Sequence, residues 1–175
     1  LPYLIGAGYR GSIICSVPSA HLLPLVIEDA LHVGFTRDQR LVQRFVKQVQ
    51  KQLVPVEYRQ WHMLLDNRDL TVCVRLKRAG HILGSCYFEL NVTYKLSGKQ
   101  ERIVFSGDLG APWSPLLFAP ESLSRADYLV LESTYGNRCH ESRRDRGRRL
   151  KTVIEKALED QGTVIVPAFS LGRTQ

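Results

Sequence analysis

Apolar and polar residues alternate over two closely spaced stretches in the middle of the chain, and this pattern constrains the fold more than any other feature. The alternation runs through 70–77 and again through 85–96, with the period of two that is typical of half-buried strands. Ser97-Gly98 then predicts a hairpin turn into a third strand over 102–105. The sequence therefore predicts an antiparallel meander with one apolar face.

Helical periodicity appears on both sides of this meander. Helices are expected from 19 to 32, from Thr36 to Pro55, and from just after Glu141 to Gly162. At the start of the second helix, Gln39 lies three residues after Thr36, which predicts a capping box. Pro55 and Gly162 are the expected stop signals of the second and third helices.

Three short apolar runs complete the expected elements. They lie at 12–16, 128–131 and 163–166, and the last two are continuous runs of the kind found in buried strands. Helices come first, then the meander, then a strand–helix–strand unit, which predicts a mixed α/β (α+β) fold class. The length of 175 residues fits one ordinary domain.

Positive charge is concentrated in two segments. The chain carries 24 Lys and Arg against 17 Asp and Glu, a formal net charge of +7, and 44% of its residues are hydrophobic, enough for a folded core. The first segment is a stripe with helical spacing, made of Arg37, Arg40, Arg44, Lys47 and Lys51. The second, 138–151, holds seven cations and two carboxylates. Two interpretations remain open: solvated helix faces, or tracks for nucleic-acid phosphates with contacts at Arg37, Arg44, Lys47, Arg144 and Arg148.

Several classes of protein are disfavoured by what the sequence lacks. It has no run of 18 apolar residues that could span a membrane, and it shows no signal-peptide pattern. The four cysteines form no CxxC pair, which argues against a zinc ribbon or a dithiol redox motif. We therefore expect a reduced, cytoplasmic protein that has no membrane partner.

Three loops that follow expected strands carry side chains with catalytic chemistry. His81 lies in the glycine-flanked segment 79–85, Asp108 lies in 106–110, and Glu132 directly follows the apolar run 128–131. Imidazole and carboxylate groups are ligands that zinc accepts. Each residue alone has a structural interpretation, as a turn residue or a helix cap. Three such loops in one chain favour a functional site, because function gathers at the carboxyl ends of strands.

Four segments, taken in order, resemble one known family. The segments AGHILGS, SGDLG, LESTYGNRCHE and VPAFSLGRTQ are similar to motifs of the β-CASP branch of the metallo-β-lactamase superfamily. That branch contains RNA-processing nucleases similar to bacterial ribonuclease J and the eukaryotic pre-mRNA 3′-end cleavage factor. The resemblance implies a four-layer αββα sandwich. Residues 1–175 would form part of that metallo-β-lactamase domain, lacking its N-terminal strands and the following β-CASP domain.

The resemblance also implies roles for individual residues. His81 would bind one of two Zn²⁺ ions, and Asp108 would bridge both of them. Glu132 would orient a catalytic histidine, so Asp108 and Glu132 are the catalytic candidates in this sequence. The residues expected near the substrate are Ser170, Arg173 and His140.

Two parts of the family pattern have no counterpart in this sequence. The HxHxDH motif, which supplies four of the family's seven usual ligands, is absent, and so are two histidines of the β-CASP domain. Because stable zinc sites take about three or four protein ligands, we expect these 175 residues alone to bind zinc weakly and not to catalyse.

For the intact protein, the resemblance implies metal-dependent phosphodiester hydrolysis of nucleic acid, with RNA favoured over DNA. Two alternatives remain: a non-catalytic RNA-binding or scaffold subunit of an RNA-processing complex, and another hydrolase of the metallo-β-lactamase fold. A homodimer is a further expectation, since the missing strands would leave an exposed sheet edge.

Overall fold

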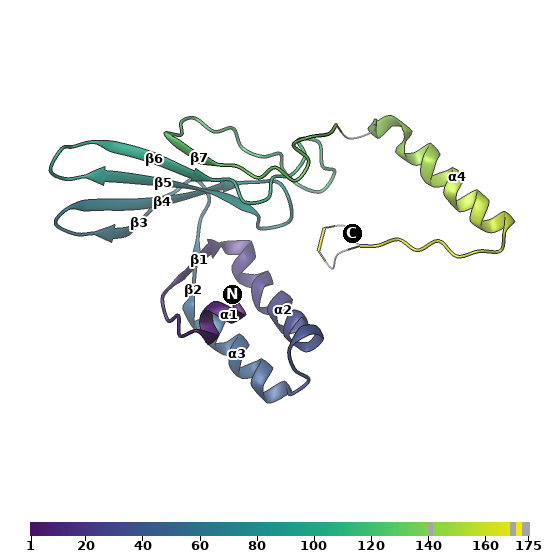
Figure 1. Ribbon diagram of the computed structural model, residues 1–175, viewed down its shortest axis with the longest axis horizontal. Helices are drawn as coiled ribbons and strands as arrows, with labels where there is room; N and C mark the ends of the chain where they lie inside the picture. Colours follow the sequence, from purple (N-terminus) through teal and green to yellow (C-terminus); the bar gives the residue numbers. More distant parts are fainter. Residues whose placement is uncertain (140–141, 169–170, 173–175) are drawn as a thin grey trace. The chain divides into compact units, whose positions relative to one another are not determined.

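The computed structural model describes residues 1–139, 142–168 and 171–172 (Figure 1). The chain divides into unit 1, Leu1–Glu132, and unit 2, Ser133–Gln175, and each is described by itself. Helices and sheets occur together, which confirms a mixed α/β (α+β) arrangement. Within the described part of the chain, no helix has both the length and the apolar character needed to cross a membrane.

Unit 1 contains most of the regular structure. Its elements are α1 (Pro2–Gly6), β1 (Ile13–Ser16), α2 (Val17–Gly34), α3 (Gln39–Gln52), β2 (Leu53–Val56), β3 (Trp61–Asp66), β4 (Leu70–Arg78), β5 (Cys86–Tyr94), β6 (Gln100–Phe105) and β7 (Tyr128–Val130). Unit 2 contains a short 3-10 helix, η1 (Arg143–Asp145), and α4 (Arg146–Glu159). The predicted helices and the predicted meander are therefore present, but α3 ends at Gln52 and its predicted stop residue, Pro55, lies within β2.

A small apolar core lies between α2 and α3. Its buried members are Ile5, Ile27, Leu31, Val42, Val46 and Val49. Val42 and Val49 are 1% and 0% exposed, whereas Arg44, Lys47 and the other cations of the stripe are exposed. α3 therefore has a buried apolar face, and the predicted stripe of cations lies on its exposed surface. Beside these helices, β1 and β2 pair in parallel.

The second part of unit 1 is a five-stranded sheet in the order β3-β4-β5-β6-β7 (Figure 1). Strands β3 to β6 pair antiparallel, and β7 pairs parallel to β6. The register places Val74 opposite Leu90, and Val56 of β2 is buried together with Val74 and Leu76. The predicted apolar face therefore exists, and it packs against residues of β1 and β2.

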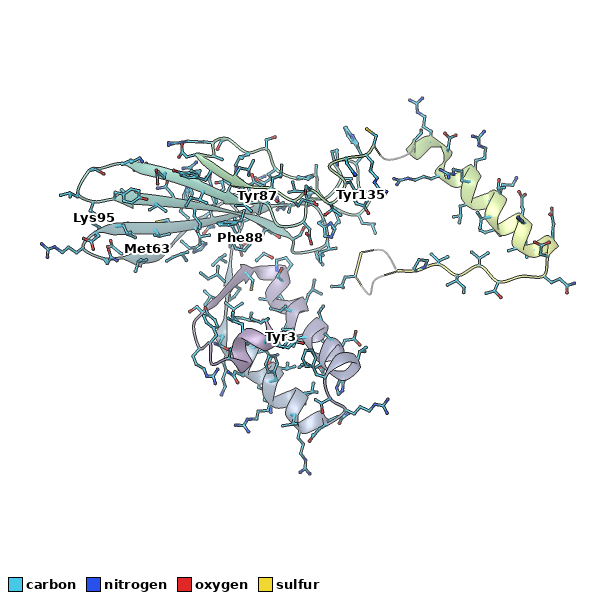
Figure 2. All side chains as sticks on the ribbon, in the orientation of Figure 1. Tyr3, Met63, Tyr87, Phe88, Lys95 and Tyr135 are labelled. Carbon is cyan, nitrogen blue, oxygen red and sulfur yellow. The ribbon has the colours of Figure 1, made fainter. Side chains whose placement is uncertain are left out.

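The β3 strand is not predicted by the sequence pattern. Most of its residues are exposed, and a register shift between Met63 and Leu65 interrupts its pairing with β4. It occupies one edge of the sheet, where Figure 2 labels Met63. An edge strand with a bulge and little burial lacks the regular alternation by which strands are recognised in a sequence.

The predicted capping box at the start of α3 is wrong. Asp38 is the N-cap, and its carboxylate accepts hydrogen bonds from the backbone N–H groups of Arg40 at 2.9 Å and Leu41 at 3.4 Å. The Thr36 hydroxyl accepts instead from the Asp38 N–H at 3.1 Å. A carboxylate directly in front of the helix takes the place of the threonine, because aspartate is a strong N-cap residue and lies closer to the free N–H groups.

Two predicted buried strands near the end of the chain also differ from the structure. β7 forms, but its residues are exposed, with Leu129 at 48%. Residues 163–166 form no strand. α4 ends at Glu159, close to the predicted stop, but Gln161 and not Gly162 takes the left-handed conformation, with a φ of +52°. Gly162 contributes its N–H, which donates to the Ala157 carbonyl at 2.7 Å. A continuous apolar run shows that a segment could be buried, but burial and pairing also require a partner.

Candidate functional site

The carboxyl ends of β4, β6 and β7 lie at the same end of the five-stranded sheet. β4 and β6 run in the same direction because each pairs antiparallel with β5, and β7 is parallel to β6. The loop 79–85 follows β4, the loop 106–110 follows β6, and Glu132 follows β7. Tyr87 lies toward this end of the sheet in Figure 2, and Lys95 lies at the opposite end of the strands. The fold therefore gathers the three predicted loops on one side of the sheet.

Hydrogen bonds donated by backbone N–H groups join the three loops directly. The Gly110 N–H donates to the Ala79 carbonyl at 2.8 Å, which ties the Asp108 loop to the His81 loop. The Leu109 N–H donates to Glu132 Oε1 at 2.8 Å, and the Glu132 N–H donates to Ser106 Oγ at 2.9 Å. These bonds bring His81, Asp108 and Glu132 onto adjoining segments.

Close approach of the backbone explains one glycine at this junction. A Cβ atom on Gly110 would lie only 1.7 Å from the Gly80 carbonyl oxygen, so no larger residue fits without moving the His81 loop. Gly80 has a φ of +68°, and a Cβ there would also meet the Phe118 carbonyl oxygen at 2.7 Å. The glycines around His81 and Asp108 therefore allow the two loops to touch.

His81 and Asp108 are both exposed, so both are accessible to a ligand from solvent. Their imidazole and carboxylate groups match the nitrogen and oxygen donors of zinc sites. Within the described residues, no group of three or more His, Cys, Asp or Glu side chains could hold a metal ion. The donors that are present fit a zinc ion in kind, and they form an incomplete set.

Glu132 has a clear structural role beside this pair. Its carboxylate is half-buried and accepts from the backbone of the Asp108 loop. Ser106, which accepts from the Glu132 N–H, in turn donates its own N–H to the Val130 carbonyl at 2.9 Å. Glu132 therefore fixes the segment that presents Asp108.

A cysteine directly after the His81 loop is a partly buried free thiol. Burial raises the pKa of the Cys86 thiol to about 11, with a smaller contribution from Cys15. Burial also raises the pKa of Cys15. Because both pKa values are raised above the ordinary value of 9.0, Cys15 and Cys86 are neutral thiols at neutral pH. Metal ligation by cysteine uses the thiolate.

The other predicted site residues belong to α3 and its start, to unit 2, or to the positions outside the described residues. Arg37, Arg44 and Lys47 lie in or just before α3 and are exposed. Arg144 is exposed, and Arg148 pairs with Asp145 at 3.0 Å. His140, Ser170 and Arg173 lie outside the described residues.

The sequence interpretation missed the residues that hold the His81 loop. The Ser85 hydroxyl accepts from the backbone N–H groups of His81 at 2.9 Å and Ile82 at 3.2 Å. Its position directly after Gly84 was a usable signal, since serine often stabilises turns through its side chain. Contacts from Ser16 and Ser19 on the Gly84 carbonyl had no such signal, because they join distant parts of the sequence.

The chain is similar along its whole length to several curated proteins. It is 31% identical over 175 residues to a ribonuclease from Thermus thermophilus. It is 32% identical over 182 residues to a transcription termination factor from Methanothermobacter thermautotrophicus, and 28% identical over 187 residues to Integrator complex subunit 11 of Danio rerio. Each alignment covers 100% of this chain but 38%, 27% and 28% of the respective relative, so the chain spans well under half of their length. No family model matches the chain.

Proposed function

The chain belongs to the β-CASP branch of the metallo-β-lactamase superfamily, and from this premise we propose that the intact protein hydrolyses phosphodiester bonds of RNA. The observation that carries the proposal is the junction of three loops, where His81, Asp108 and Glu132 lie on segments joined by hydrogen bonds. Similarity to a protein named as a ribonuclease supports RNA as the substrate.

We further propose that zinc is the metal and that His81 and Asp108 hold it. Imidazole nitrogen and carboxylate oxygen are donors that zinc accepts. When bound, the metal ions would stabilise charge on the phosphate and lower the pKa of a water molecule. The remaining ligands of a pair of Zn²⁺ ions would come from outside these 175 residues, within a four-layer αββα sandwich.

The protein's own groups have separate tasks in this proposal. Glu132 holds the Asp108 loop through the Leu109 N–H, so it would keep the Asp108 carboxylate in place. We also assign to Glu132 the orientation of a histidine that protonates the leaving oxygen, a general-acid step. Ser170, Arg173 and His140 are the proposed substrate contacts.

Charge supports the choice of a polyanionic substrate. The α3 cations Arg44 and Lys47, with Arg37 just before the helix, all face solvent, and we propose that they contact phosphates, as do Arg144 and Arg148. Clustered Lys and Arg gain affinity for nucleic acid by releasing condensed counterions. The cytoplasmic location, binding of DNA and a homodimer stay predictions.

The test is the substitution Asp108→Ala in the whole protein, with hydrolysis of a labelled RNA and metal content as readouts. We expect the rate to fall by more than about 100-fold, since loss of even an outer-shell partner of a metal ligand costs up to that factor. Asp69→Ala is the matched control. Asp69 is an exposed aspartate in the turn between β3 and β4, at the opposite end of the strands from Asp108.

Two results would count against the assignment. An unchanged rate in the Asp108→Ala variant would exclude Asp108 from the catalytic centre. If the unsubstituted protein binds the RNA but does not cleave it, the non-catalytic RNA-binding subunit becomes the better interpretation. A DNA strand of the same sequence, assayed in parallel, measures the preference for RNA.

A further inference from the structure

Two serine hydroxyls at the start of α2 bind the loop that carries His81. Ser16 Oγ donates to the Gly84 carbonyl at 2.6 Å, and Ser19 Oγ donates to the same carbonyl at 3.0 Å. The two serines precede Gly84 by 68 and 65 residues, so these contacts exist only in the folded chain. A carbonyl oxygen has two lone pairs and can accept from both hydroxyls.

Burial indicates that this contact is a built part of the fold. Ser16 is 0% exposed, and a buried hydroxyl is costly unless it is hydrogen-bonded. Gly84 has a φ of +88°, and a Cβ on it would lie 2.6 Å from Ser19 Oγ and 2.9 Å from the Ser19 nitrogen. The first turn of α2 therefore packs directly on the backbone of the loop, at a position that only glycine fits.

Helix capping alone does not account for this arrangement. As N-cap of α2, Ser16 accepts from the Ser19 N–H at 3.3 Å, which is longer than the 2.9 Å bond from Arg40 to the cap Asp38 in α3. The one hydroxyl proton of Ser16 has no role in the cap, and the Gly84 carbonyl at 2.6 Å is a nearer acceptor for it than Ser19 Oγ at 3.0 Å. Ser19 lies inside the helix, so its hydroxyl is not needed for the helix to form.

The bound carbonyl is linked to His81 through one residue. Ser85 follows Gly84, and its hydroxyl accepts from the N–H groups of His81 at 2.9 Å and Ile82 at 3.2 Å. The Ser85 carbonyl accepts from the Ala79 N–H at 3.2 Å. Movement of Gly84 would therefore displace the backbone of His81.

We propose that Ser16 and Ser19 are positioning residues that fix the His81 loop from the start of α2. Metal sites depend on such outer partners, whose loss typically weakens metal binding by about 10- to 100-fold. The inference rests on the proposed role of His81 as a metal ligand. Its first part, the fixing of the loop, stands independently of that role.

The first experiment measures amide hydrogen exchange of residues 81–85 in the whole protein. Ser19→Ala removes one donor to Gly84 and leaves the N-cap intact, whereas Ser16→Ala removes the other donor and the cap. Asp38→Ala is the matched control, because it removes the N-cap of α3 and touches no residue of the loop. We expect exchange in the loop to rise severalfold in both serine variants, to stay unchanged in Asp38→Ala, and to be restored in Ser19→Thr.

Two outcomes of this experiment would overturn the proposal. One is unchanged exchange in the loop for Ser19→Ala and Ser16→Ala. The other is an equal rise in Asp38→Ala, which would show that general loss of helix stability accounts for the effect.

The second experiment measures Zn²⁺ affinity of the same proteins together with His81→Ala. We expect about 10-fold weaker binding in Ser19→Ala and a larger loss in His81→Ala. If His81→Ala binds zinc normally, the proposed metal assignment fails while the loop result remains. If His81→Ala loses affinity but Ser19→Ala does not, despite faster exchange, the positioning role is wrong.

Discussion

The helices α3 and α4 are alike in sequence pattern and different in what surrounds them. Each has 14 residues, and each combines a row of cations with an apolar face. α3 in unit 1 buries Val42, Val46 and Val49. α4 in unit 2 buries none of its residues, and Val153 is 52% exposed. Periodicity determines which face of a helix is apolar, but only a packing partner determines whether that face leaves water.

The two helices also begin differently. The Asp38 carboxylate caps α3 through two backbone N–H groups. Asp145 precedes α4 in the same way, but its carboxylate makes no capping bond and pairs with Arg148 at 3.0 Å. Unit 1 therefore holds its helix by a cap and a core, and unit 2 holds its helix by local interactions. The candidate site belongs to unit 1, where the surroundings can fix a side chain.

The largest expected difference between the units concerns ion pairs. Glu89 is 0% exposed and accepts from Arg75 Nε at 2.7 Å, with Lys77 Nζ at 3.4 Å. Glu89→Ala should cost about 3–5 kcal/mol of unfolding free energy, because it leaves two cations in a mostly buried setting. The measurement is urea denaturation followed by tryptophan fluorescence, since Trp61 and Trp113 both lie in unit 1.

The matched change in unit 2 is Glu155→Ala. Glu155 pairs with Lys151 at 3.5 Å on the surface of α4, and such a pair is worth only about 0.3–0.5 kcal/mol. Far-ultraviolet circular dichroism measures the loss of α4 helicity in this variant. Similar costs for the two substitutions would refute the distinction between a buried and a surface pair.

A second contrast uses the same substitution on both helices. Val42→Ala removes two methyl groups from a side chain that is 1% exposed, and it should cost about 2 kcal/mol from lost burial and cavity formation. Val153→Ala in α4 should change stability by less than about 0.5 kcal/mol, as surface substitutions do. A large effect of Val153→Ala on the denaturation midpoint would show that the apolar face of α4 is covered in solution.

Burial in unit 1 also predicts a dependence on alkaline pH. Burial, followed by the charges of Glu89 and Glu121, raises the pKa of Tyr87 to about 12. Between pH 10 and pH 12 the unfolded chain loses this proton while the folded chain keeps it, so stability should fall as pH rises. Tyr87→Phe should flatten this part of the curve of melting temperature against pH.

The Cys86 thiol should add a second decrease in melting temperature, at lower pH than that of Tyr87. The pKa of Cys86 is about 11, above its ordinary value of 9.0, so its contribution should be lost between about pH 9 and pH 11 by the same reasoning. For the Tyr87 prediction, an unchanged dependence of melting temperature on pH in Tyr87→Phe would mean that the Tyr87 hydroxyl is hydrated in the folded protein.

The smallest expected effect compares the cations of the two helices in RNA binding. Within the described residues no carboxylate lies at ion-pair distance from Arg44 or Lys47, whereas Arg148 is paired with Asp145. If the α3 cations contact phosphates, replacing Arg44 and Lys47 by alanine should reduce the slope of log affinity against log salt by about 1.4, or about 0.7 per contact.

Arg148→Ala is the comparison in unit 2. It should change the slope less, because an arginine already paired with a carboxylate releases fewer counterions. The slopes come from titrations of a labelled RNA at several salt concentrations. If the slope does not change in the α3 variant, its cations form a solvated helix face.

The sequence alone determined the elements whose signals are local. Alternation indicated β4, β5 and β6, and glycine-flanked turns indicated the loops of His81 and Asp108. These predictions succeeded because side-chain periodicity and the conformational freedom of glycine act within a few residues. The family resemblance was equally local, since it depended on short motifs in a fixed order.

Only the tertiary structure decided which of those elements are covered and what holds the site. It placed three loops at one end of the sheet through bonds such as that from the Gly110 N–H to the Ala79 carbonyl. It also brought the hydroxyls of Ser16 and Ser19 into hydrogen bonds with the Gly84 carbonyl. It also left β7 and the apolar face of α4 exposed. Contacts between distant residues leave no periodic signal in either segment, because each depends on the partner that folding brings to it.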